Sequence, residues 1–582
     1  MCVEELEDLL PFRCSEDDHR LLTRVVTGEE IKKVIFSMPK DKSPGPDGYT
    51  SEFYKASWEI IGDEVIIAIQ SFFAKVFLPK GVNSTILALI PKKKEAREIK
   101  DYRPISCCNV LYKAISKILA NRLKRILPKF IVGNQSAFVK DRLLIENVLL
   151  ATELVKDYHK DSISTRCAMK IDISKAFDSL QWSFLTHVLA AMNFPGEFIH
   201  WISLCMSTAS FSIQVNGELA GYFRSARGLR QGCSLSPYLF VISMDVLSRM
   251  LDKAAGAREF GYHPRCKTLG LTHLCFADDL MILTDGKIRS VDGIIKVLNQ
   301  FAAKSGLKNC MEKTTLYLAG VSDHSRQLMS SRYSFGVGKL PVRYLGLPLV
   351  TKRLTTSDYS SLIDQIRRRI GTWTSRYLSF AGRLSLINSV LWSITNFWMN
   401  AFRLPRECIN EINRISSAFL WSRPELKKAK VSWDEICKPK KEGGLGLRSL
   451  REANEVSSLK LIWRLLSCQD SLWVKWTRMN LLKKESFWSI GTHSTLGSWI
   501  WRRLLKHREV AKSFCKIEVN NGVNTSFWFD NWSEKGPLIN LTGARGAIDM
   551  GISRHMTLAE AWSRRRRRRH RVEILNEFKE IL

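Results

Sequence analysis

The sequence predicts a protein of the α+β class, in which short strands and amphipathic helices occupy separate stretches of the chain. Two apolar runs, 274–276 and 280–283, flank a tight turn and indicate an antiparallel strand pair. Apolar side chains recur at helical spacing between residues 110 and 127 and indicate a long amphipathic helix. A chain of 582 residues is too long for one compact core, so three or four subdomains are expected.

The same two periodicities predict the remaining elements. Residues 1–80 are expected to be mostly helical. In chain order, the predicted elements are a helix at 60–73, a strand at 85–90, a basic turn at 92–94, the helix at 110–127, a strand at 167–173 followed by a helical pattern from 174, a loop at 228–237 that enters a helix, the strand pair at 274–283, and a helical region at 355–425. Charged side chains that interrupt these patterns are the first candidates for function.

Asp278 and Asp279 are adjacent carboxylates at or beside the turn between the two apolar strands. Adjacent carboxylates repel each other and resist burial, so a hydrophobic core has no use for them. A divalent metal would relieve both problems, because hard cations favour carboxylate oxygens. Taken alone, such a pair is more often a solvated hairpin turn than a metal site.

Two further features stand upstream of this pair, in an order that favours a site. Asp172 lies where a strand gives way to a helix, from which a ligand can reach out of a sheet; the alternative is a helix-capping or loop carboxylate. The loop 228–237 carries glycines and small hydroxyl residues before a helix, which lets a ligand approach the backbone closely. Its alternative is a plain entry into the helix.

With these residues the chain resembles the reverse transcriptase segment of non-LTR retrotransposons of the LINE type, and most closely the plant members. The resemblance covers roughly residues 20–535. Besides the three features above, it rests on the motifs Lys42–Gly48, Leu89–Lys92, Asp101–Ser106, Asn134–Phe138 and Tyr344–Gly346. Full-length relatives carry an endonuclease domain before the polymerase, and the sequence shows none, so a truncated copy is expected.

The resemblance implies a right-hand polymerase fold with fingers, a palm built on an antiparallel sheet, and a helical thumb. Fingers and palm together would form the reverse transcriptase domain, at about 85–350. The implied subdomains are an N-terminal helical extension at 1–84, fingers at 85–165, palm at 166–350, thumb at 351–425, and a mainly helical, Trp-rich, basic C-terminal region at 426–582.

The resemblance also implies the catalytic residues. Asp172, Asp278 and Asp279 match the three catalytic carboxylates, which would hold two Mg²⁺ ions, with Mn²⁺ as an alternative. One metal ion would activate the primer 3′-hydroxyl, and the other would stabilise the leaving pyrophosphate. The implied reaction is RNA-directed DNA synthesis, in which dNTPs are added to a primer.

Five residues match nucleotide-binding positions of the family. Arg103 would contact the incoming triphosphate, and Phe177 would exclude a ribose 2′-hydroxyl. Gln231 and Gly232 would pack against nucleotide and template, and Lys313 would assist departure of pyrophosphate. The alternatives are an ordinary core aromatic for Phe177 and a solvated surface charge for Lys313.

The charge balance agrees with a nucleic-acid partner. A net charge of +32 and a pI near 9.7 point to a polyanion, which the resemblance specifies as an RNA template and a DNA primer. No apolar run reaches the length of a membrane span and the first residues are acidic, so no membrane partner is expected. Fourteen cysteines without C-x-x-C spacing indicate reduced thiols, in the cytoplasm or, as the mechanism favours, the nucleus. The oligomeric state stays open.

The C-terminal third has an unusual composition. Of 17 tryptophans, 14 lie beyond residue 370, where they either stack on unpaired bases or, as we favour, pack between helices. The run Arg564–Arg569, followed by His570 and Arg571, is either a nuclear address or RNA contact, or a solvated charged tract.

Two other functions remain open. A nucleic-acid-binding remnant without catalysis would keep the basic surface, but intact Asp172, Asp278 and Asp279 argue against it. A splicing factor resembling group II intron maturases would need a maturase helical domain after the thumb, whereas residues 425–535 resemble the plant retroelement pattern.

Overall fold

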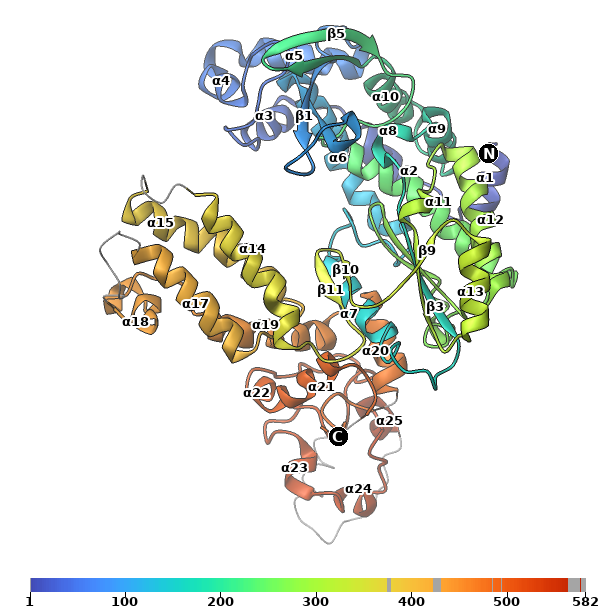
Figure 1. Cartoon of the computed structure of the whole chain (residues 1–582), viewed down its shortest axis with the longest axis vertical. Helices are drawn as coiled ribbons and strands as arrows, with labels where there is room; N and C mark the ends of the chain where they lie inside the picture. Colours follow the sequence, from blue (N-terminus) through green and yellow to red (C-terminus); the bar gives the residue numbers. More distant parts are fainter. Residues whose placement is uncertain are drawn as a thin grey trace. The chain divides into compact units, whose positions relative to one another are not determined.

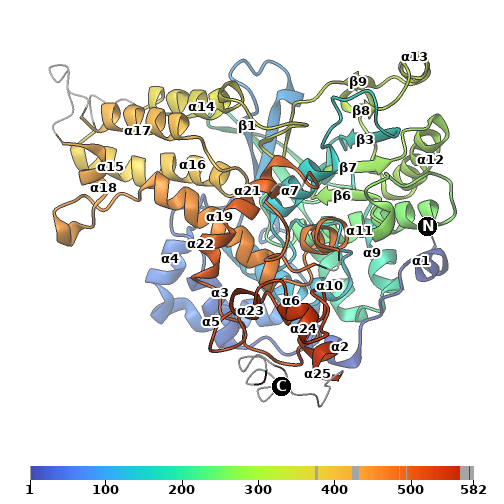
Figure 2. The same ribbon diagram turned by 90° about the horizontal axis from the view of Figure 1, so that it is seen from below.

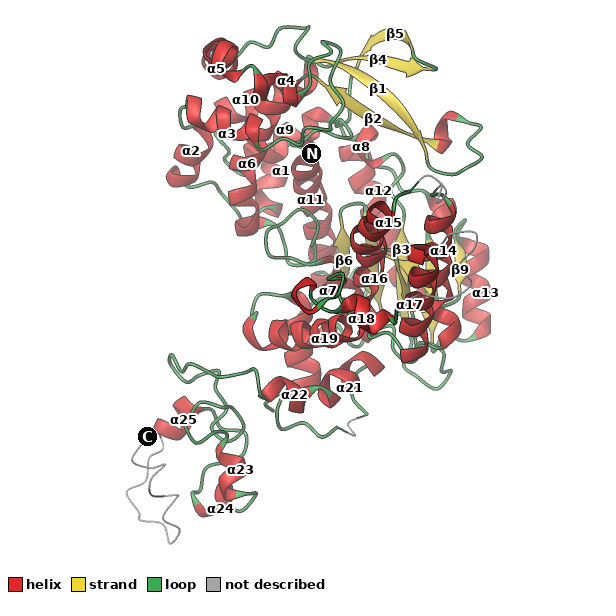
Figure 3. Ribbon diagram, turned by 90° about the vertical axis from the view of Figure 1, so that its left-hand side faces the viewer, coloured by secondary structure: helices red, strands yellow, loops and turns green. Residues whose placement is uncertain are grey.

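The computed structural model describes residues 2–373, 378–421, 431–483, 485–492, 495–563 and 576. Figure 1 follows the chain from the N-terminal helices in blue to the C-terminal helices in red, and Figure 3 separates helices from strands by colour. Helices dominate, and the strands of the described residues fall into three sheets. The predicted α+β class is confirmed. The predicted Arg-rich run 564–571 lies outside the described residues.

The chain divides into two compact units, and each is discontinuous in sequence. The first comprises Met1–Asn147 and Lys160–Lys339, and the second comprises Val148–His159 and Leu340–Leu582. The division falls within helix α7 (Leu144–Leu154), whose later turns belong to the second unit. The predicted boundaries of fingers, palm and thumb stay predictions.

The N-terminal part of the first unit is helical, as predicted. Its helices are α1 (Val3–Leu9), α2 (Glu16–Thr23), α3 (Gly28–Phe36), α4 (Ser51–Ala56) and α5 (Trp58–Lys75). The hydroxyl groups of Ser15, Thr27 and Thr50 accept hydrogen bonds from backbone N–H groups in the first turns of α2, α3 and α4. The predicted amphipathic helix at 60–73 is α5.

A four-stranded sheet follows, in the order β2-β1-β4-β5. Its strands are β1 (Ser84–Pro91), β2 (Tyr102–Cys108), β4 (Ser210–Val215) and β5 (Glu218–Arg224), with the 3-10 turn η1 (Ile99–Asp101) before β2. β1 is antiparallel to β2 and parallel to β4. Helix α6 (Val110–Phe130) begins directly after β2 and buries the apolar stripe from which it was predicted.

The central sheet of the first unit has the order β6-β7-β3-β8-β9, and Figure 2 shows these strands side by side. They are β3 (Arg166–Ile171), β6 (His273–Phe276), β7 (Asp279–Thr284), β8 (Thr315–Ala319) and β9 (Gly336–Gly338). All neighbouring pairs are antiparallel except β8 and β9. The sheet is therefore the antiparallel one expected of a palm, and the predicted strands at 167–173 and 274–283 are confirmed.

Helices connect and cover this sheet. They are α8 (Ala176–Ser179), α9 (Trp182–Ala191), α10 (Gly196–Ser207), α11 (Ser236–Gly256), α12 (Ile288–Ser305) and α13 (Asp323–Arg332), with 3-10 turns η2 (Lys267–Leu269) and η3 (Met311–Lys313). The helical pattern expected from residue 174 is interrupted at Leu180, which has an extended backbone. The Leu180 carbonyl accepts a hydrogen bond from the Gly228 N–H (2.7 Å). In a continuous helix this carbonyl would instead accept a hydrogen bond from a backbone N–H of the next turn.

The second unit is helical apart from the hairpin of β10 (Val342–Tyr344) and β11 (Leu347–Leu349). Its described helices after α7 are η4 (Thr356–Tyr359), α14 (Ser360–Gly371), α15 (Phe380–Leu386), η6 (Ile387–Leu391), α16 (Trp392–Met399), α17 (Arg406–Trp421), α18 (Trp433–Cys437), η7 (Lys440–Glu442), α19 (Leu450–Ser467), α20 (Leu472–Thr477), η8 (Arg478–Leu482), α21 (Trp499–Lys506), α22 (Arg508–Lys512), α23 (Leu538–Thr542), α24 (Gly546–Asp549) and α25 (Leu558–Ser563). The predicted helical region at 355–425 is confirmed where it is described.

A buried carboxylate joins the two sequence segments of the second unit. Glu153, on α7, is only 3% exposed and accepts hydrogen bonds from the Ser498 N–H (2.7 Å) and hydroxyl group (2.6 Å). Ser498 is also the N-cap of α21. The short segment Val148–His159 is thereby fixed to a helix that lies far downstream in sequence.

Side-chain packing buries several of the tryptophans that lie beyond residue 370. Trp473, Trp476 and Trp528 are at most 3% exposed, whereas Trp463 is 61% exposed. All cysteines in the described part of the chain are free thiols. None of the helices in the described ranges combines the length and apolar composition that a bilayer span needs.

Candidate active site

The turn between β6 and β7 carries the adjacent carboxylates. Phe276 pairs with Asp279 across the hairpin, so Ala277 and Asp278 form the two-residue connection. Ala277 has φ +55°, in the left-handed region that residues with a side chain rarely adopt. A non-glycine residue in this conformation needs support from its surroundings.

Gln135 supplies that support. Its side chain is 1% exposed, and its Oε1 accepts hydrogen bonds from the backbone N–H groups of Ala137 (2.9 Å) and Ala277 (3.0 Å). Its Nε2 donates to the sulfur of Cys275 (3.1 Å). The neighbouring backbone pairs with the same strand, because Cys275 N–H donates to Asn134 O (2.9 Å) and Ser136 N–H donates to Cys275 O (3.1 Å). One buried amide therefore fixes the backbone directly before Asp278.

The segment that carries Gln135 is itself tightly held. The Arg142 guanidinium donates to the backbone carbonyls of Ile131, Val132 and Gln135, each at 2.6 Å. Asp245, which is fully buried in α11, accepts a hydrogen bond from the Val132 N–H (2.8 Å). The support of the turn thus extends from the sheet into α11.

Asp172 lies beside this turn. It follows the last residue of β3, and the pairing of Ile171 with Leu280 continues to place Asp172 opposite Asp279. The Asp172 carbonyl accepts a hydrogen bond from the Cys310 N–H (2.7 Å), so the backbone beyond β3 is fixed on its other side as well. The structure brings the three predicted carboxylates together at one end of the central sheet.

The electrostatics of the three carboxylates follow from this proximity. Asp278 is exposed as a residue, but its neighbours remove part of the hydration of its carboxyl group, which raises its pKa; Asp172 adds to the increase and Arg103 opposes it. The pKa of Asp279 is also raised, first by burial and then by Asp278 and Asp172, while Lys170 opposes the increase. Ionisation is therefore costly for both groups unless a cation joins them.

The donor set fits a magnesium ion. No group of three or more His, Cys, Asp or Glu side chains within the described ranges is arranged to hold a metal ion by itself. Mg²⁺ in polymerase sites does not need such a group, because it is bound by one or two carboxylates together with waters and substrate phosphates. Neighbouring carboxylate oxygens with raised pKa values have the chemistry that this mode of binding requires.

Phe177 and the loop 228–237 form a second part of the site. Phe177 is half-buried and stacks on Phe240 of α11, with ring centroids 4.9 Å apart. Its carbonyl accepts a hydrogen bond from the Leu229 N–H (2.6 Å), and the Trp182 indole N–H donates to Gly228 O (2.7 Å). One face of the Phe177 ring therefore packs in the core, as the alternative interpretation predicts. This packing remains compatible with a role of Phe177 in binding.

Gln231 and Gly232 are held against the first sheet. The Gln231 carbonyl accepts a hydrogen bond from the Ser106 N–H on β2 (2.8 Å), and the Gln231 side chain donates to Asp178 (3.5 Å). Gly232 has φ +106°, and a Cβ there would lie 3.2 Å from Ser106 O. Glycine is required by conformation and contributes to the close approach of loop and strand.

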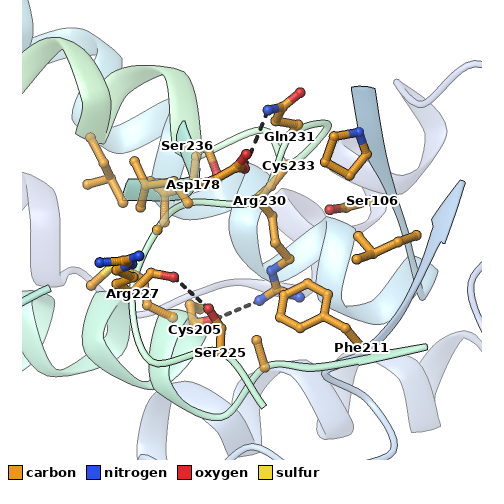
Figure 4. Close-up of a pocket in the computed structure, with 18 of the residues that line it drawn as sticks. Ser106, Asp178, Cys205, Phe211, Ser225, Arg227, Arg230, Gln231, Cys233 and Ser236 are labelled. Atoms are coloured by element: carbon orange, nitrogen blue, oxygen red, sulfur yellow. Dashed lines mark hydrogen bonds between the residues drawn. The ribbon is translucent and has the colours of Figure 1, made fainter. Parts of the chain in front are cut away.

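Arg230 anchors this loop from beneath. Its side chain is buried, and its guanidinium lies 3.8 Å from the ring centroid of Tyr112, donates to Thr85 Oγ1 (3.1 Å), and donates to Cys205 O (2.5 Å). Figure 4 shows it in a cavity of about 220 Å³, with the Asp178–Gln231 hydrogen bond above it. Asp172, Asp278 and Asp279 do not line this cavity, so it is a space behind the loop and not the carboxylate site.

Arg103 and Lys313 complete the predicted set. Arg103 is exposed on β2 and close enough to Asp278 to oppose the rise in its pKa, so the structure brings the two together. Lys313 ends η3, the turn that begins beside Cys310 and hence beside the Asp172 backbone; its side chain is exposed. Reasoning from the sequence assigned no role to Gln135, Arg142 or Lys170, although Gln135 lies inside one of the motifs noted.

Comparisons with known proteins agree with this geometry. Residues 90–349 match the protein family described as reverse transcriptase (RNA-dependent DNA polymerase). The chain is 28% identical over 471 residues to the Transposon TX1 uncharacterized 149 kDa protein of Xenopus laevis, covering 80% of this chain and 35% of that protein.

Two further relatives are more distant or shorter matches. The retrovirus-related Pol polyprotein from type-2 retrotransposable element R2DM of Drosophila melanogaster is 27% identical over 358 residues, covering 58% of this chain and 32% of its own. An Arabidopsis thaliana protein whose name assigns it provisionally to ribonuclease H is 32% identical over 211 residues, covering 35% of this chain and 33% of its own. The chain spans about a third of the length of these three relatives.

Proposed function

We propose that the reverse transcriptase domain at residues 90–349, of the type found in non-LTR retrotransposon proteins, makes this chain an RNA-directed DNA polymerase. It would add dNTPs to the 3′-hydroxyl of a DNA primer on an RNA template. One observation carries the proposal: Asp172, Asp278 and Asp279 lie together at the end of the central sheet, inside the segment that matches the family.

Each residue has a proposed task. Asp172, Asp278 and Asp279 would hold two Mg²⁺ ions, or Mn²⁺ in their place, which would supply Lewis-acid activation of the primer hydroxyl and charge neutralisation at the pyrophosphate. Arg103, exposed beside Asp278, would bind the triphosphate through its planar guanidinium. Lys313 would donate to the departing pyrophosphate.

Phe177, Gln231 and Gly232 would form the wall of the nucleotide site. The loop is fixed to both β2 and the Phe177 backbone, so the three residues move as one rigid part. The Phe177 ring, supported on one face by Phe240, would block the position of a ribose 2′-hydroxyl.

Two finer assignments belong to the proposal. The sequence motifs, together with the 32% identical match to a protein of Arabidopsis thaliana, support a plant LINE-type element as the source. Copying of an element into chromosomal DNA supports the nucleus as the place of action. Fingers at 85–165, palm at 166–350 and thumb at 351–425 are the proposed subdomains.

Primer extension tests the proposal. The full chain is incubated with a heteropolymeric RNA template, an annealed DNA primer, dNTPs and Mg²⁺, beside the variant Asp278→Ala/Asp279→Ala. We expect extension by the wild type and at least a thousandfold less by the variant, with equal binding of the primer–template duplex. A wild type that binds the duplex without extending it would show a binding protein that has lost polymerisation.

A further inference from the structure

A basic hollow lies in the second unit, apart from the residues given roles above. Its volume is about 950 Å³. It is lined by Arg353, Arg403, Leu404, Pro405, Arg406, Ile409, Asn410, Arg451, Asn454, Glu455, Thr492, Trp499, Arg502, Arg503, Lys506 and His507. We propose that this basic hollow binds the phosphodiester backbone of single-stranded nucleic acid.

Three helices and two connecting segments bring the cations together. Arg406 opens α17, Arg451 lies in the first turn of α19, and Arg502, Arg503 and Lys506 lie within the single helix α21, whereas Arg353 and Arg403 come from connecting segments. Because residues three and four apart share a helix face, Arg502 and Arg503 each lie beside Lys506. The charge is concentrated by the tertiary fold and not by a run in the sequence.

The basic hollow is short of negative charge. Seven Arg and Lys side chains line it, and Glu455 is the single carboxylate among its lining residues in the described part of the chain. Glu455 contacts Arg403 at 3.4 Å. For the other six cations, the lining therefore offers no carboxylate besides Glu455, which already pairs with Arg403.

Burial and the repulsion between neighbouring cations lower the pKa of two basic groups in the lining. Burial, followed by Arg403 and Arg353, lowers the pKa of Arg503, and Tyr359 opposes this effect. Burial, followed by Arg403 and Arg503, also lowers the pKa of His507, and Glu455 opposes this effect. His507 is therefore neutral at pH 7 and does not add to the charge. An anion in the basic hollow would relieve this repulsion directly.

The wall of the basic hollow is rigid. Asn454, which is 3% exposed, accepts a hydrogen bond from the Leu404 N–H (2.9 Å) and donates to the Leu404 carbonyl (3.0 Å). The Arg503 guanidinium donates to Arg403 O (3.4 Å), and the Tyr359 hydroxyl group donates to the same carbonyl (3.3 Å). These contacts hold the segment that carries Arg403 before any ligand arrives, which lowers the entropy cost of binding.

The groups that face the basic hollow are mostly donors. Trp499 is 7% exposed, and its indole N–H has no hydrogen-bond partner among the described residues. Planar guanidinium groups pair with phosphate oxygens through two parallel hydrogen bonds. The basic hollow offers many donors over a volume much larger than one phosphate requires. This favours binding of a chain of phosphates over binding of a single anion. The nature of this polyanion rests on the proposed function, but the site itself does not.

Salt-dependent RNA binding tests the inference. The variant Arg406→Gln/Arg451→Gln/Arg502→Gln removes three exposed cations of the basic hollow. The matched control, Lys440→Gln/Lys441→Gln/Arg545→Gln, removes three exposed cations of the same unit outside it. Binding of a short, unstructured, labelled RNA is measured by fluorescence anisotropy at several salt concentrations. All proteins are full length, and circular dichroism is used to confirm that each variant is folded.

We expect the basic-hollow variant to lose at least tenfold in affinity at low salt. The slope of log K against log salt should fall by about 2, since each lost contact to single-stranded phosphate contributes about 0.7. The control should stay within twofold of the wild type. The variant Arg403→Lys/Arg503→Lys, which keeps the charge but not the guanidinium geometry, should show an unchanged slope and weaker binding.

Three outcomes would overturn the inference: equal losses in the two triple variants, no loss in either, or full competition by inorganic tripolyphosphate at concentrations equimolar with RNA phosphate. Single-stranded DNA of the same sequence, run in parallel, shows whether the 2′-hydroxyl contributes. Primer extension is assayed separately. If the basic-hollow variant loses RNA binding while the wild type binds RNA but never extends primers, the result would support the basic hollow and contradict the proposed function.

Discussion

At the scale of single residues, the amide of Gln135 is the group on which the position of Asp278 depends most directly. Gln135→Leu keeps the volume but leaves two buried N–H groups without their acceptor, at a cost of about 1–3 kcal/mol each. We expect kcat of primer extension to fall at least tenfold and the KM for dNTP to change less than threefold. Steady-state kinetics across a Mg²⁺ titration measure both, and the variant should require more Mg²⁺.

Asn134→Ala is the control for that prediction. Asn134 is adjacent in sequence, and the substitution keeps its backbone carbonyl, which accepts the hydrogen bond from Cys275 N–H. Its side chain contacts His273 (3.4 Å) and makes no hydrogen bond to the turn. If Asn134→Ala lowers kcat as much as Gln135→Leu, or if only thermal stability changes, Gln135 is not a positioning residue for the turn.

Phe177 allows a test of sugar selection. Phe177→Ala would open the space beside the loop 228–237 while leaving Phe240 in the core, so the variant should accept ribonucleotides. We expect the ratio of kcat/KM for dCTP over CTP to fall at least tenfold. Phe240→Leu, which removes the stacking partner 4.9 Å away but not the Phe177 ring, should reduce the ratio much less. An unchanged ratio in Phe177→Ala would leave Phe177 as a core aromatic only.

At the scale of elements, the segment before α23 carries a carboxylate whose ionisation opposes folding. Asp530 accepts hydrogen bonds from the Ser526 N–H (2.6 Å) and the Ser486 hydroxyl group (3.3 Å), yet burial raises its pKa from 3.8 to about 6. A raised pKa in the folded state means that the stabilising contribution is complete below pH 3.8 and is lost as the pH rises through 6.

Asp530→Asn should therefore alter the pH dependence of stability. Between pH 5 and pH 8 the wild type should lose roughly 1.5 kcal/mol in the unfolding free energy of this region relative to the variant. Urea unfolding followed by tryptophan fluorescence measures the difference, because Trp528 lies in the same small core. Glu518→Gln, at an exposed carboxylate, serves as control. Parallel pH profiles of wild type and Asp530→Asn would contradict the prediction.

Elements with a strong local pattern could be predicted from the sequence. Helix α6 followed from its apolar spacing, and the hairpin of β6 and β7 followed from two apolar runs around a turn. The interruption between α8 and α9 could not be predicted, because its cause is a hydrogen bond from Gly228. Such a contact leaves no trace in local periodicity.

The residues of the candidate site likewise divide into those that the sequence predicts and those that it does not. Asp172, Asp278 and Asp279 stand out because carboxylates beside apolar strands need an explanation. Gln135 does not stand out, because a glutamine is unremarkable until its bond to Ala277, 142 residues away, is seen. The cations of the basic hollow are equally ordinary in the sequence, since they come from four separate segments.

At the scale of the whole molecule, the chain leaves one compact unit at Asn147, returns at Lys160, and finishes in the other after Lys339. The family match at 90–349 crosses this division three times. Sequence-based boundaries treat subdomains as continuous stretches, so the membership of Val148–His159 could not be predicted. Only the tertiary contacts of this segment assign it to the second unit.

The hydrogen bonds of Glu153 to Ser498 have a consequence for modular exchange. If the family-matched segment alone were moved into another protein, the buried carboxylate of Glu153 would lose both hydrogen bonds that Ser498 donates to it. The family-matched segment is therefore not a self-sufficient cassette. Recombination between related genes should preserve the pairing of these two distant regions, so hybrids joined between residues 160 and 498 need matched parents on both sides of the junction.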